Sequence, residues 1–150
     1  TEIVDETILT MRPVFKKTPY EITQRIPEDL VLDSYPGPLG QVISNLLNNT
    51  ILHAFDGRTE GCVNLEAQFL NSDHICLIVR DNGLGIPAAN LNRIFDPFFT
   101  TKLGQDGTGL GLNIVHTITT GILGGGIKVE SIEGAGTAFI ITLPTVAPEA

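Results

Sequence analysis

The chain has 150 residues, of which 42% are hydrophobic and 17% are charged, and its formal net charge is −8. This composition predicts one globular domain with a sizeable core and excludes an intrinsically disordered chain. Only 9 residues are Lys or Arg, so no basic face for binding nucleic acid is visible. No apolar run approaches the roughly 20 residues of a membrane span, and the acidic first ten residues do not resemble a signal peptide.

The two cysteines and the two chain ends add little chemistry of their own. Cys62 and Cys76 fall in neighbouring predicted strands without ligand-like spacing, which favours structural thiols in a reducing compartment. The chain starts without Met and ends in a Pro- and Ala-containing run. We therefore expect residues 1–150 to be one domain of a longer protein, with 1–2 and 145–150 as linker remnants.

The first third of the chain predicts a helix, one or two strands and a second helix. Apolar residues at near-helical spacing predict a helix over Glu2–Lys16, and alternation predicts a strand over Tyr20–Pro27. Leu30–Leu32 adds a possible short strand. Residues 35–38, Tyr-Pro-Gly-Pro, indicate a break, and a helix is predicted to follow over Leu39–Phe55.

Two stripes of side chains run along the helix predicted after this break. The residues expected to face the core are Leu39, Ile43, Leu46, Leu47, Thr50 and Ala54. Gln41, Asn45, Asn49 and His53 recur at steps of four and share another face. Asparagine costs a helix roughly 0.6 kcal/mol relative to alanine, so this stripe favours amides that hold a ligand or cation. A solvated polar face is the alternative.

The middle of the chain predicts a hairpin that delivers an acidic residue to a glycine-containing loop. Strands are expected over Val63–Leu70 and Ile75–Arg80, and the second is almost wholly apolar, which predicts a central position. It leads into Asp81-Asn-Gly-Leu-Gly-Ile-Pro87, and residues 87–93 predict a short helix with Pro near its start. Asp81 at the end of a buried strand is best interpreted as a ligand contact.

The segment Ile94–Val115 has the pattern of a lid over phosphates. A cluster of Phe95, Phe98 and Phe99 anchors its start, Lys102 adds a cation, and glycines recur at 107, 109 and 111 before an apolar helix. Backbone N–H groups at a helix start attract anions. The alternative is a long mobile surface loop. Neither a P-loop nor a G-x-G-x-x-G fingerprint occurs.

The last third of the chain predicts a helix and a hairpin. The helix is expected over Gly111–Leu123, ended by the glycines at 124–126. The residues of this helix expected to point inward are Leu112, Val115, Ile118 and Ile122. Strands follow over Ile127–Ile132 and Thr137–Leu143. The whole chain therefore predicts an α+β fold, a mixed sheet of about five strands with three or four helices on one face.

Four motifs stand in one order along the chain. They are N-L-L-x-N at 45–49, D-N-G-x-G-I-P at 81–87, F-D-P-F-F-T-T-K at 95–102 and G-T-G-L-G-L at 107–112. With G-x-G-T-x-F at 134–139, they closely resemble the catalytic ATP-binding domain of sensor histidine kinases, in the superfamily shared with gyrase-type ATPases and MutL. The resemblance covers nearly the whole chain and implies a two-layer α/β sandwich of the Bergerat type with a mostly antiparallel sheet.

The resemblance also implies roles for individual residues. Asn49 matches the Mg²⁺ ligand, Asn45 faces the phosphates, Asp81 contacts adenine, and Thr137 supports Asp81. Asn45, Asn49 and Lys102 are the residues expected to take part in catalysis. The other residues expected at the nucleotide are His53, Gly83, Gly85, Ile86, Phe98, Thr100, Thr101, Gly107, Thr108, Gly109, Leu110, Gly111 and Leu112.

Elementary chemistry agrees with these roles. An ionised carboxylate only accepts hydrogen bonds, so Asp81 suits the amine of adenine and opposes the carbonyl of guanine. Mg²⁺ prefers oxygen ligands and keeps several bound waters. An asparagine amide oxygen and the phosphate oxygens can supply the remaining ligands. The chain departs from the family pattern at Thr50, where a small residue is usual, and at Leu52, where a cation is often found. His53 could replace that cation or be a partly exposed helix-end residue.

The implied activity is transfer of the γ-phosphoryl group of Mg-ATP to a histidine on a separate helical dimerisation domain, which in turn serves a response regulator. His53, His74 and His116 all lack a phosphoacceptor context, so that domain is expected outside this chain. We interpret His74 as a turn residue and His116 as helix surface. The resemblance further implies that the domain binds ATP and ADP, acts in the cytoplasm and is a monomer when isolated, and that the full-length protein is a homodimer. The acidic composition predicts no nucleic-acid partner.

Three other functions remain open at this point. Gyrase- and MutL-type ATPases carry a glutamate one turn before the metal-binding asparagine; Asn45 stands there, and a neutral amide is a poor base. An anti-sigma-type binding switch would generally lack the Phe-rich motif at 95–102. A nucleotide-binding pseudokinase is compatible with all four motifs.

Overall fold

The computed structural model describes residues 20–26, 36–50, 61–83, 85–86, 89, 91, 94–95 and 111–146. Two helices and five strands are defined there. They are β1 (Tyr20–Arg25), α2 (Pro36–Asn49), β2 (Gly61–Phe69), β3 (His74–Asp81), α3 (Gly111–Gly121), β4 (Gly126–Ile132) and β5 (Gly136–Pro144). The helix predicted over Glu2–Lys16 and the short strand over Leu30–Leu32 lie outside the described residues, as does most of the helix predicted over 87–93.

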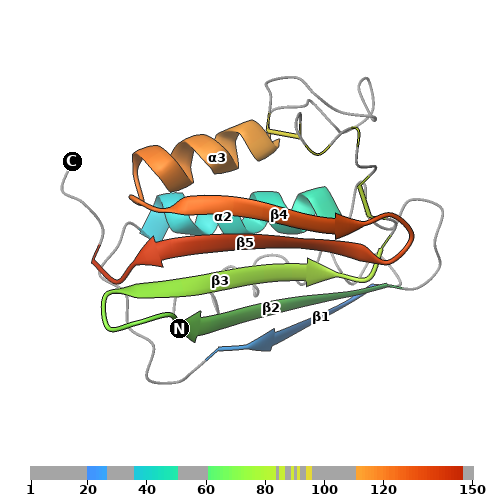
Figure 1. Cartoon of the computed structure of the whole chain (residues 1–150), viewed down its shortest axis with the longest axis horizontal. Helices are drawn as coiled ribbons and strands as arrows, with labels where there is room; N and C mark the ends of the chain where they lie inside the picture. Colours follow the sequence, from blue (N-terminus) through green and yellow to red (C-terminus); the bar gives the residue numbers. More distant parts are fainter. Residues whose placement is uncertain are drawn as a thin grey trace.

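The five strands form one mixed sheet in the order β1-β2-β3-β5-β4. β1 and β2 run parallel, and the other three pairs are antiparallel. β3 is the central strand, as its apolar sequence predicts, and it is buried at five successive positions. Figure 1 shows α2 and α3 together on one face of this sheet, so the predicted two-layer α+β architecture is confirmed.

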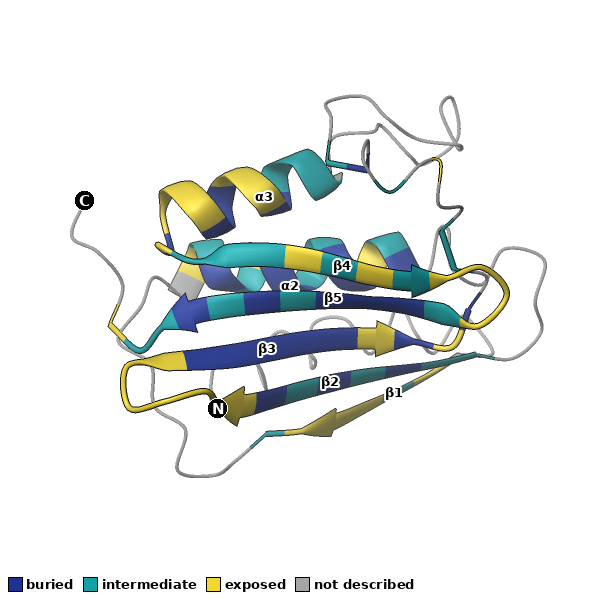
Figure 2. Cartoon of the chain, viewed as in Figure 1, coloured by how far each residue is buried: buried dark blue, intermediate teal, exposed yellow. Residues whose placement is uncertain are grey.

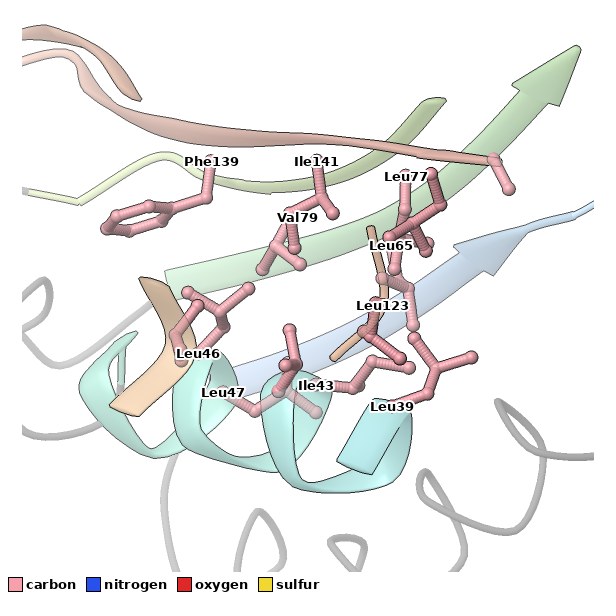
Figure 3. Packing of buried hydrophobic residues seen from close by; sticks show 14 of the residues in the cluster. Leu39, Ile43, Leu46, Leu47, Leu65, Leu77, Val79, Leu123, Phe139 and Ile141 are labelled. Atoms are coloured by element: carbon pink, nitrogen blue, oxygen red, sulfur yellow. The ribbon is translucent and has the colours of Figure 1, made fainter. Parts of the chain in front are cut away.

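The core fills the space between the helices and the facing side of the sheet. Figure 2 shows buried residues concentrated on β3, β5 and the inner sides of both helices. In Figure 3, Leu39 lies near Leu123 at one end of the core, and Leu46 lies near Phe139 at the other. The order of these contacts sets the direction of α2: its C-terminal half lies at the end of the sandwich where β5 begins.

The start of α2 differs from the prediction. The Tyr-Pro-Gly-Pro run was expected to form a break before a helix at Leu39, but α2 begins at Pro36. Proline is favoured in a first helical turn, because its missing N–H would have no intrahelical partner there. The predicted core stripe is confirmed for Leu39, Ile43, Leu46, Leu47 and Thr50, all of them buried. Ala54 and the predicted end at Phe55 lie outside the described residues.

The end of α3 also differs. The helix ends at Gly121, before the glycines at 124–126, and Ile122 is 42% exposed although it was predicted to point inward. The N–H groups of Ile122 and Leu123 both donate to the carbonyl of Ile118 at 3.0 Å, which closes the last turn. Because the chain leaves the helical path there, Leu123 enters the core in place of Ile122. Beyond Gly121, the helical periodicity therefore no longer predicts which side chains are buried.

The two hairpins are confirmed, with small shifts at their ends. β2 begins at Gly61 and β3 at His74, so His74 is a strand residue and not the turn residue expected. Both cysteines are free thiols. Burial raises the pKa of the Cys76 thiol, which keeps it protonated. Within the described residues, no helix is long and apolar enough to cross a membrane.

Candidate functional site

Several predicted site residues come together at one end of the sandwich. β3 ends there at Asp81, β5 begins there at Gly136, and α3 begins there at Gly111 (Figure 1). The C-terminal half of α2, with Asn45 and Asn49, lies at the same end. Sequence positions separated by nearly one hundred residues thus meet because β3, β5 and the two helices all start or finish at this edge.

Asp81 is the buried acidic group of this end. The residue is only 7% exposed. One carboxylate oxygen, Oδ1, accepts a hydrogen bond of 2.9 Å from the N–H of Gly83. The loop that follows β3 therefore turns back over the carboxylate, and Gly83 is itself buried. Hydrogen bonds from N–H groups stabilise the ionised form of a carboxylate.

A row of three polar side chains crosses the sheet at Asp81. Thr137 on β5 is paired directly with Asp81 on β3, and Ser131 on β4 is paired directly with Thr137. Directly paired residues point to the same face of a sheet. In this row that is the face of Val79 and Phe139, which pack toward the helices. A cavity of ≈ 230 Å³ at these strands also has Arg80, Glu130 and Ala138 in its lining. These three alternate with the row along their strands, so this cavity does not mark the space between the row and the helices.

Two glycines allow the backbone segments of this end to approach closely. Gly85 has a φ of 75°, and a Cβ placed on it would lie 2.3 Å from the carbonyl oxygen of Ile132. Gly136 has a φ of 131°, and its Cβ would lie 2.2 Å from the carbonyl oxygen of Asp81. Only glycine fits such positions without a backbone shift. The loop after β3 is thereby held against the β4–β5 hairpin.

Asn45 and Asn49 are half-buried on α2, whereas Asn48 between them is exposed. No hydrogen bond joins either half-buried side-chain amide to the part of the chain that the structure describes. The two amides are therefore available to hydrogen-bond a ligand or water. The described residues contain no group of three or more His, Cys, Asp or Glu side chains that could hold a metal ion. A cation here would be held by amide oxygens, by the ligand and by water, which fits the preferences of Mg²⁺.

The segment before the predicted lid is fixed by the first turns of α3. The side-chain amide of Asn113 donates a 3.1 Å hydrogen bond to the carbonyl oxygen of Phe95. The Phe95 ring lies 5.6 Å from the His116 ring and 6.5 Å from the Phe139 ring, centroid to centroid. Phe95 and Leu112 therefore pack against the core. Phe98, Phe99 and the predicted lid lie outside the described residues, so the anchoring of a lid stays a prediction.

Comparison with known proteins places this geometry in a family. Residues 35–147 match the family described as histidine kinase-, DNA gyrase B- and HSP90-like ATPases. The chain belongs to this family. Sensor histidine kinase ZraS of Salmonella typhimurium is 47% identical over 112 residues, which is 75% of this chain and 23% of that protein. The chain therefore spans about a quarter of the length of this relative.

Solved structures narrow the family to histidine kinase catalytic domains. The nucleotide-free catalytic domain of histidine kinase ThkA has a TM-score of 0.84 and 29% identity, covering 97% of this chain and 91% of that one. ThkA in complex with the response regulator protein TrrA gives a TM-score of 0.79 at 26% identity, covering 97% of this chain and 40% of that one. Full-length ShkA in complex with AMPPNP gives 0.78 at 25%, covering 99% of this chain and 30% of that one.

Several residues expected to line the nucleotide in a histidine kinase catalytic domain lie outside the described part of this chain. They are His53, Phe98, Thr100, Thr101, Lys102, Gly107, Thr108, Gly109 and Leu110. Gly111 is the first residue of α3. The helix therefore begins within the last part of the 107–112 motif.

Three residues of this catalytic domain were missed by sequence reasoning. Asn113 looked like one polar position on an apolar helix, yet it bonds to Phe95. Ser131 looked like an ordinary strand residue, yet it accepts a 2.7 Å hydrogen bond from the N–H of Ile86. Gly136 stands in the G-x-G-T-x-F motif, yet no role was assigned to it. No local signal identifies the first two, because both contacts join residues at least 18 positions apart.

Proposed function

We propose that this domain binds Mg-ATP and donates the γ-phosphoryl group to a histidine on a separate dimerisation and phosphoacceptor domain, in two-component signal transduction. The observation that carries the proposal is the meeting of three features at one end of the sandwich. They are the buried Asp81–Thr137 pair, the half-buried amides of Asn45 and Asn49, and the start of α3 at Gly111. These features offer a base contact, a metal contact and an anion contact, respectively.

The base contact favours adenine. An ionised Asp81 presents only acceptors, and the N–H of Gly83 already donates to Oδ1. The exocyclic amine of adenine supplies the complementary donor, whereas guanine would place a carbonyl oxygen against the carboxylate. Two opposed acceptors form no hydrogen bond with each other, and in a buried site the missing bond costs about 1–3 kcal/mol.

The metal and phosphate contacts come from the two helices. Asn49 would bind Mg²⁺ through its amide oxygen, and Asn45, one turn earlier on the same face, would face the phosphates. When bound, Mg²⁺ neutralises phosphate charge and helps to align the γ-phosphoryl group. The N–H groups of the first turn of α3 would donate hydrogen bonds to phosphate oxygens. Lys102 and the glycines at 107–111 are proposed to close over the nucleotide as a lid.

The acceptor nucleophile must come from elsewhere. α2 contains no acidic residue, so it offers no carboxylate base for activating water. His74 at the start of β3 and His116 in the middle of α3, the two described histidines, are exposed and lack a phosphoacceptor context. A separate helical domain would bring its histidine in line with the γ-phosphate. Because ThkA is known in complex with TrrA, we propose a response regulator as the downstream partner.

The wider setting follows from the same proposal. We propose that residues 1–150 form one domain of a longer, homodimeric protein and that the isolated domain is a monomer. We also propose a cytoplasmic site of action, where ATP is abundant and where the free thiols Cys62 and Cys76 stay reduced.

The test is incubation with ATP labelled at the γ-phosphate, with and without the cognate helical domain. The chain alone should bind ATP, yet neither label itself nor release phosphate at a useful rate. Adding the helical domain should label that domain on histidine, an acid-labile modification. Steady phosphate release by the chain alone, abolished by Asn49→Ala, would instead favour an ATPase. Tight ATP binding without labelling of the acceptor would favour a binding switch or a pseudokinase.

A further inference from the structure

One hydroxyl group joins the loop after β3 to the β4–β5 hairpin. Ser131 Oγ accepts a hydrogen bond of 2.7 Å from the N–H of Ile86. It also donates to the carbonyl oxygen of Gly136 at 3.0 Å. Its third neighbour is Thr137 Oγ1 at 2.9 Å, where either oxygen could be the donor. Three backbone or side-chain groups thus share one oxygen with a single proton.

Counting protons gives the direction of the third bond when all three contacts are hydrogen bonds at the same time. A backbone N–H only donates and a carbonyl only accepts, while a hydroxyl has one proton and two lone pairs. The proton of Ser131 is used on Gly136, so its two lone pairs accept from Ile86 and from Thr137. Thr137 must therefore donate its only proton to Ser131. The oxygen of Thr137 is left with acceptor lone pairs alone.

This direction matters because Thr137 is paired directly with Asp81 across β5 and β3. Both residues are less than 10% exposed. One presents a carboxylate and the other a hydroxyl oxygen whose proton is used elsewhere. Both are therefore acceptors toward anything that reaches them. A ligand group that contacts the pair favourably must bring hydrogens, as an amine does and a carbonyl does not.

We propose that Ser131 is a positioning residue that sets the base preference of the nucleotide site by holding Thr137 as an acceptor. The inference rests on the proposed function, because it assumes that the base lies at Asp81 and Thr137. Ser131 touches neither the base nor the reacting atoms. It acts through the proton of Thr137 and through the backbone of Ile86.

The test compares ATP with ITP, which carries a carbonyl in place of the 6-amine of adenine. In the wild-type domain, ATP should bind more tightly than ITP. Ser131→Ala releases the proton of Thr137, so that Thr137 can donate to the ITP carbonyl or to Asp81. The ratio of ATP to ITP affinity should then fall about threefold to tenfold, the range given by the net contribution of one hydrogen bond.

Matched variants separate this effect from general loosening. Ser131→Thr keeps the hydroxyl and should restore the wild-type ratio. Ser72→Ala makes the same substitution in the exposed β2–β3 turn and should change nothing. In a Thr137→Val background, Ser131→Ala should leave the ratio unaltered, because the effect passes through Thr137. If Ser131→Ala does not fold, Ser131→Cys preserves the shape with a weak donor and acceptor.

The outcomes distinguish this inference from the proposed function. If the wild-type domain binds no nucleotide, the proposed function fails and this inference fails with it. If wild-type binds ATP over ITP and Ser131→Ala keeps that ratio, the inference alone is wrong. It is also wrong if Ser131→Ala weakens ATP and ITP equally, since that result describes a loosened loop and not a changed donor pattern.

Discussion

Gly136 holds β5 against the strand end that carries Asp81, so Gly136→Ala should damage both the fold and the site. Its φ of 131° is a conformation that L-residues rarely adopt. A Cβ there would lie 2.2 Å from the carbonyl oxygen of Asp81, whereas real Cβ contacts stay above 3.0 Å. The backbones of β3 and β5 would have to separate by about 0.8 Å, the difference between these two distances.

The expected loss of stability has two parts. A non-glycine residue in such a strained conformation costs about 1–3 kcal/mol. Separating the strands weakens one or two ladder hydrogen bonds, each worth about 1 kcal/mol. The free energy of unfolding should therefore fall by about 2–5 kcal/mol. For a domain of this size that corresponds to a decrease in Tm of about 5–20 °C.

Gly134→Ala is the matched control, because Gly134 lies in the same hairpin with a φ of 86° but has nothing within 4 Å of an added Cβ. It should lose only the conformational cost of about 1–2 kcal/mol. Thermal unfolding of both variants measures stability, and ATP titration at a temperature where both are folded measures the site. ATP affinity should fall for Gly136→Ala and stay unchanged for Gly134→Ala. Equal Tm losses in the two variants, or full ATP affinity in Gly136→Ala, would refute the close approach of these strands.

Four further predictions address separate residues. Asp81→Ala should weaken ATP binding by about 2–3 kcal/mol in calorimetry, while Asp73→Ala in the exposed β2–β3 turn should leave it unchanged. Equal ATP and GTP affinity in the wild-type domain would contradict the role of Asp81. Asn49→Ala should abolish the Mg²⁺ dependence of ATP binding and block transfer to a supplied acceptor domain, while Asn48→Ala, on the exposed side of α2, should retain both. Thr119 Oγ1 is buried without a hydrogen-bond partner among the described residues, so Thr119→Val should raise the free energy of unfolding by about 1 kcal/mol. The control is Thr50→Val, which removes a 3.1 Å hydrogen bond to the carbonyl of Leu46 and should leave the free energy of unfolding unchanged or lower it. Since burial raises the pKa of Cys76, the Cys76 thiol should react with a disulfide reagent more slowly at pH 7 than the thiol of the half-buried Cys62. Its reaction rate should increase as the pH rises. Comparable rates for the two thiols at pH 7 would show that Cys76 is accessible.

The sheet could be predicted from the sequence because the patterns that indicate its strands and turns lie within short stretches of the chain. Apolar character along Ile75–Arg80 predicts a central strand, and β3 is central. Alternation and short turns predict the two hairpins, and both form. The errors fall at the ends of elements: at the start of β3, where His74 was expected in the turn, and at two helix ends. A proline-containing first turn resembles a break, and the inward side of α3 was extended past Gly121, where the backbone leaves the helical path.

The candidate site could be predicted only where a motif marks it. Asp81 and Asn49 stand in motifs, and the spacing of four along α2 correctly separates the half-buried Asn45 and Asn49 from the exposed Asn48. Ser131 and Asn113 could not be found this way. Their partners are 45 and 18 positions away, and the bonds exist only because β4 and α3 pack beside the loops that follow β3. Such contacts depend on the tertiary structure, which periodicity does not specify.

A chain of net charge −8 must still attract a polyphosphate, and the distribution of charge explains how. α2 and α3 contain no Asp, Glu, Lys or Arg, so no carboxylate on either helix repels an anion at the proposed phosphate end. The described pair Arg80–Glu66, 3.9 Å apart, lies on the opposite face of the sheet. Exposed charges more than about 10 Å away are largely screened at physiological salt, whereas the N–H groups at the start of α3 act at contact distance. Neutral amides and a helix start therefore allow an acidic domain to hold phosphate without a basic patch.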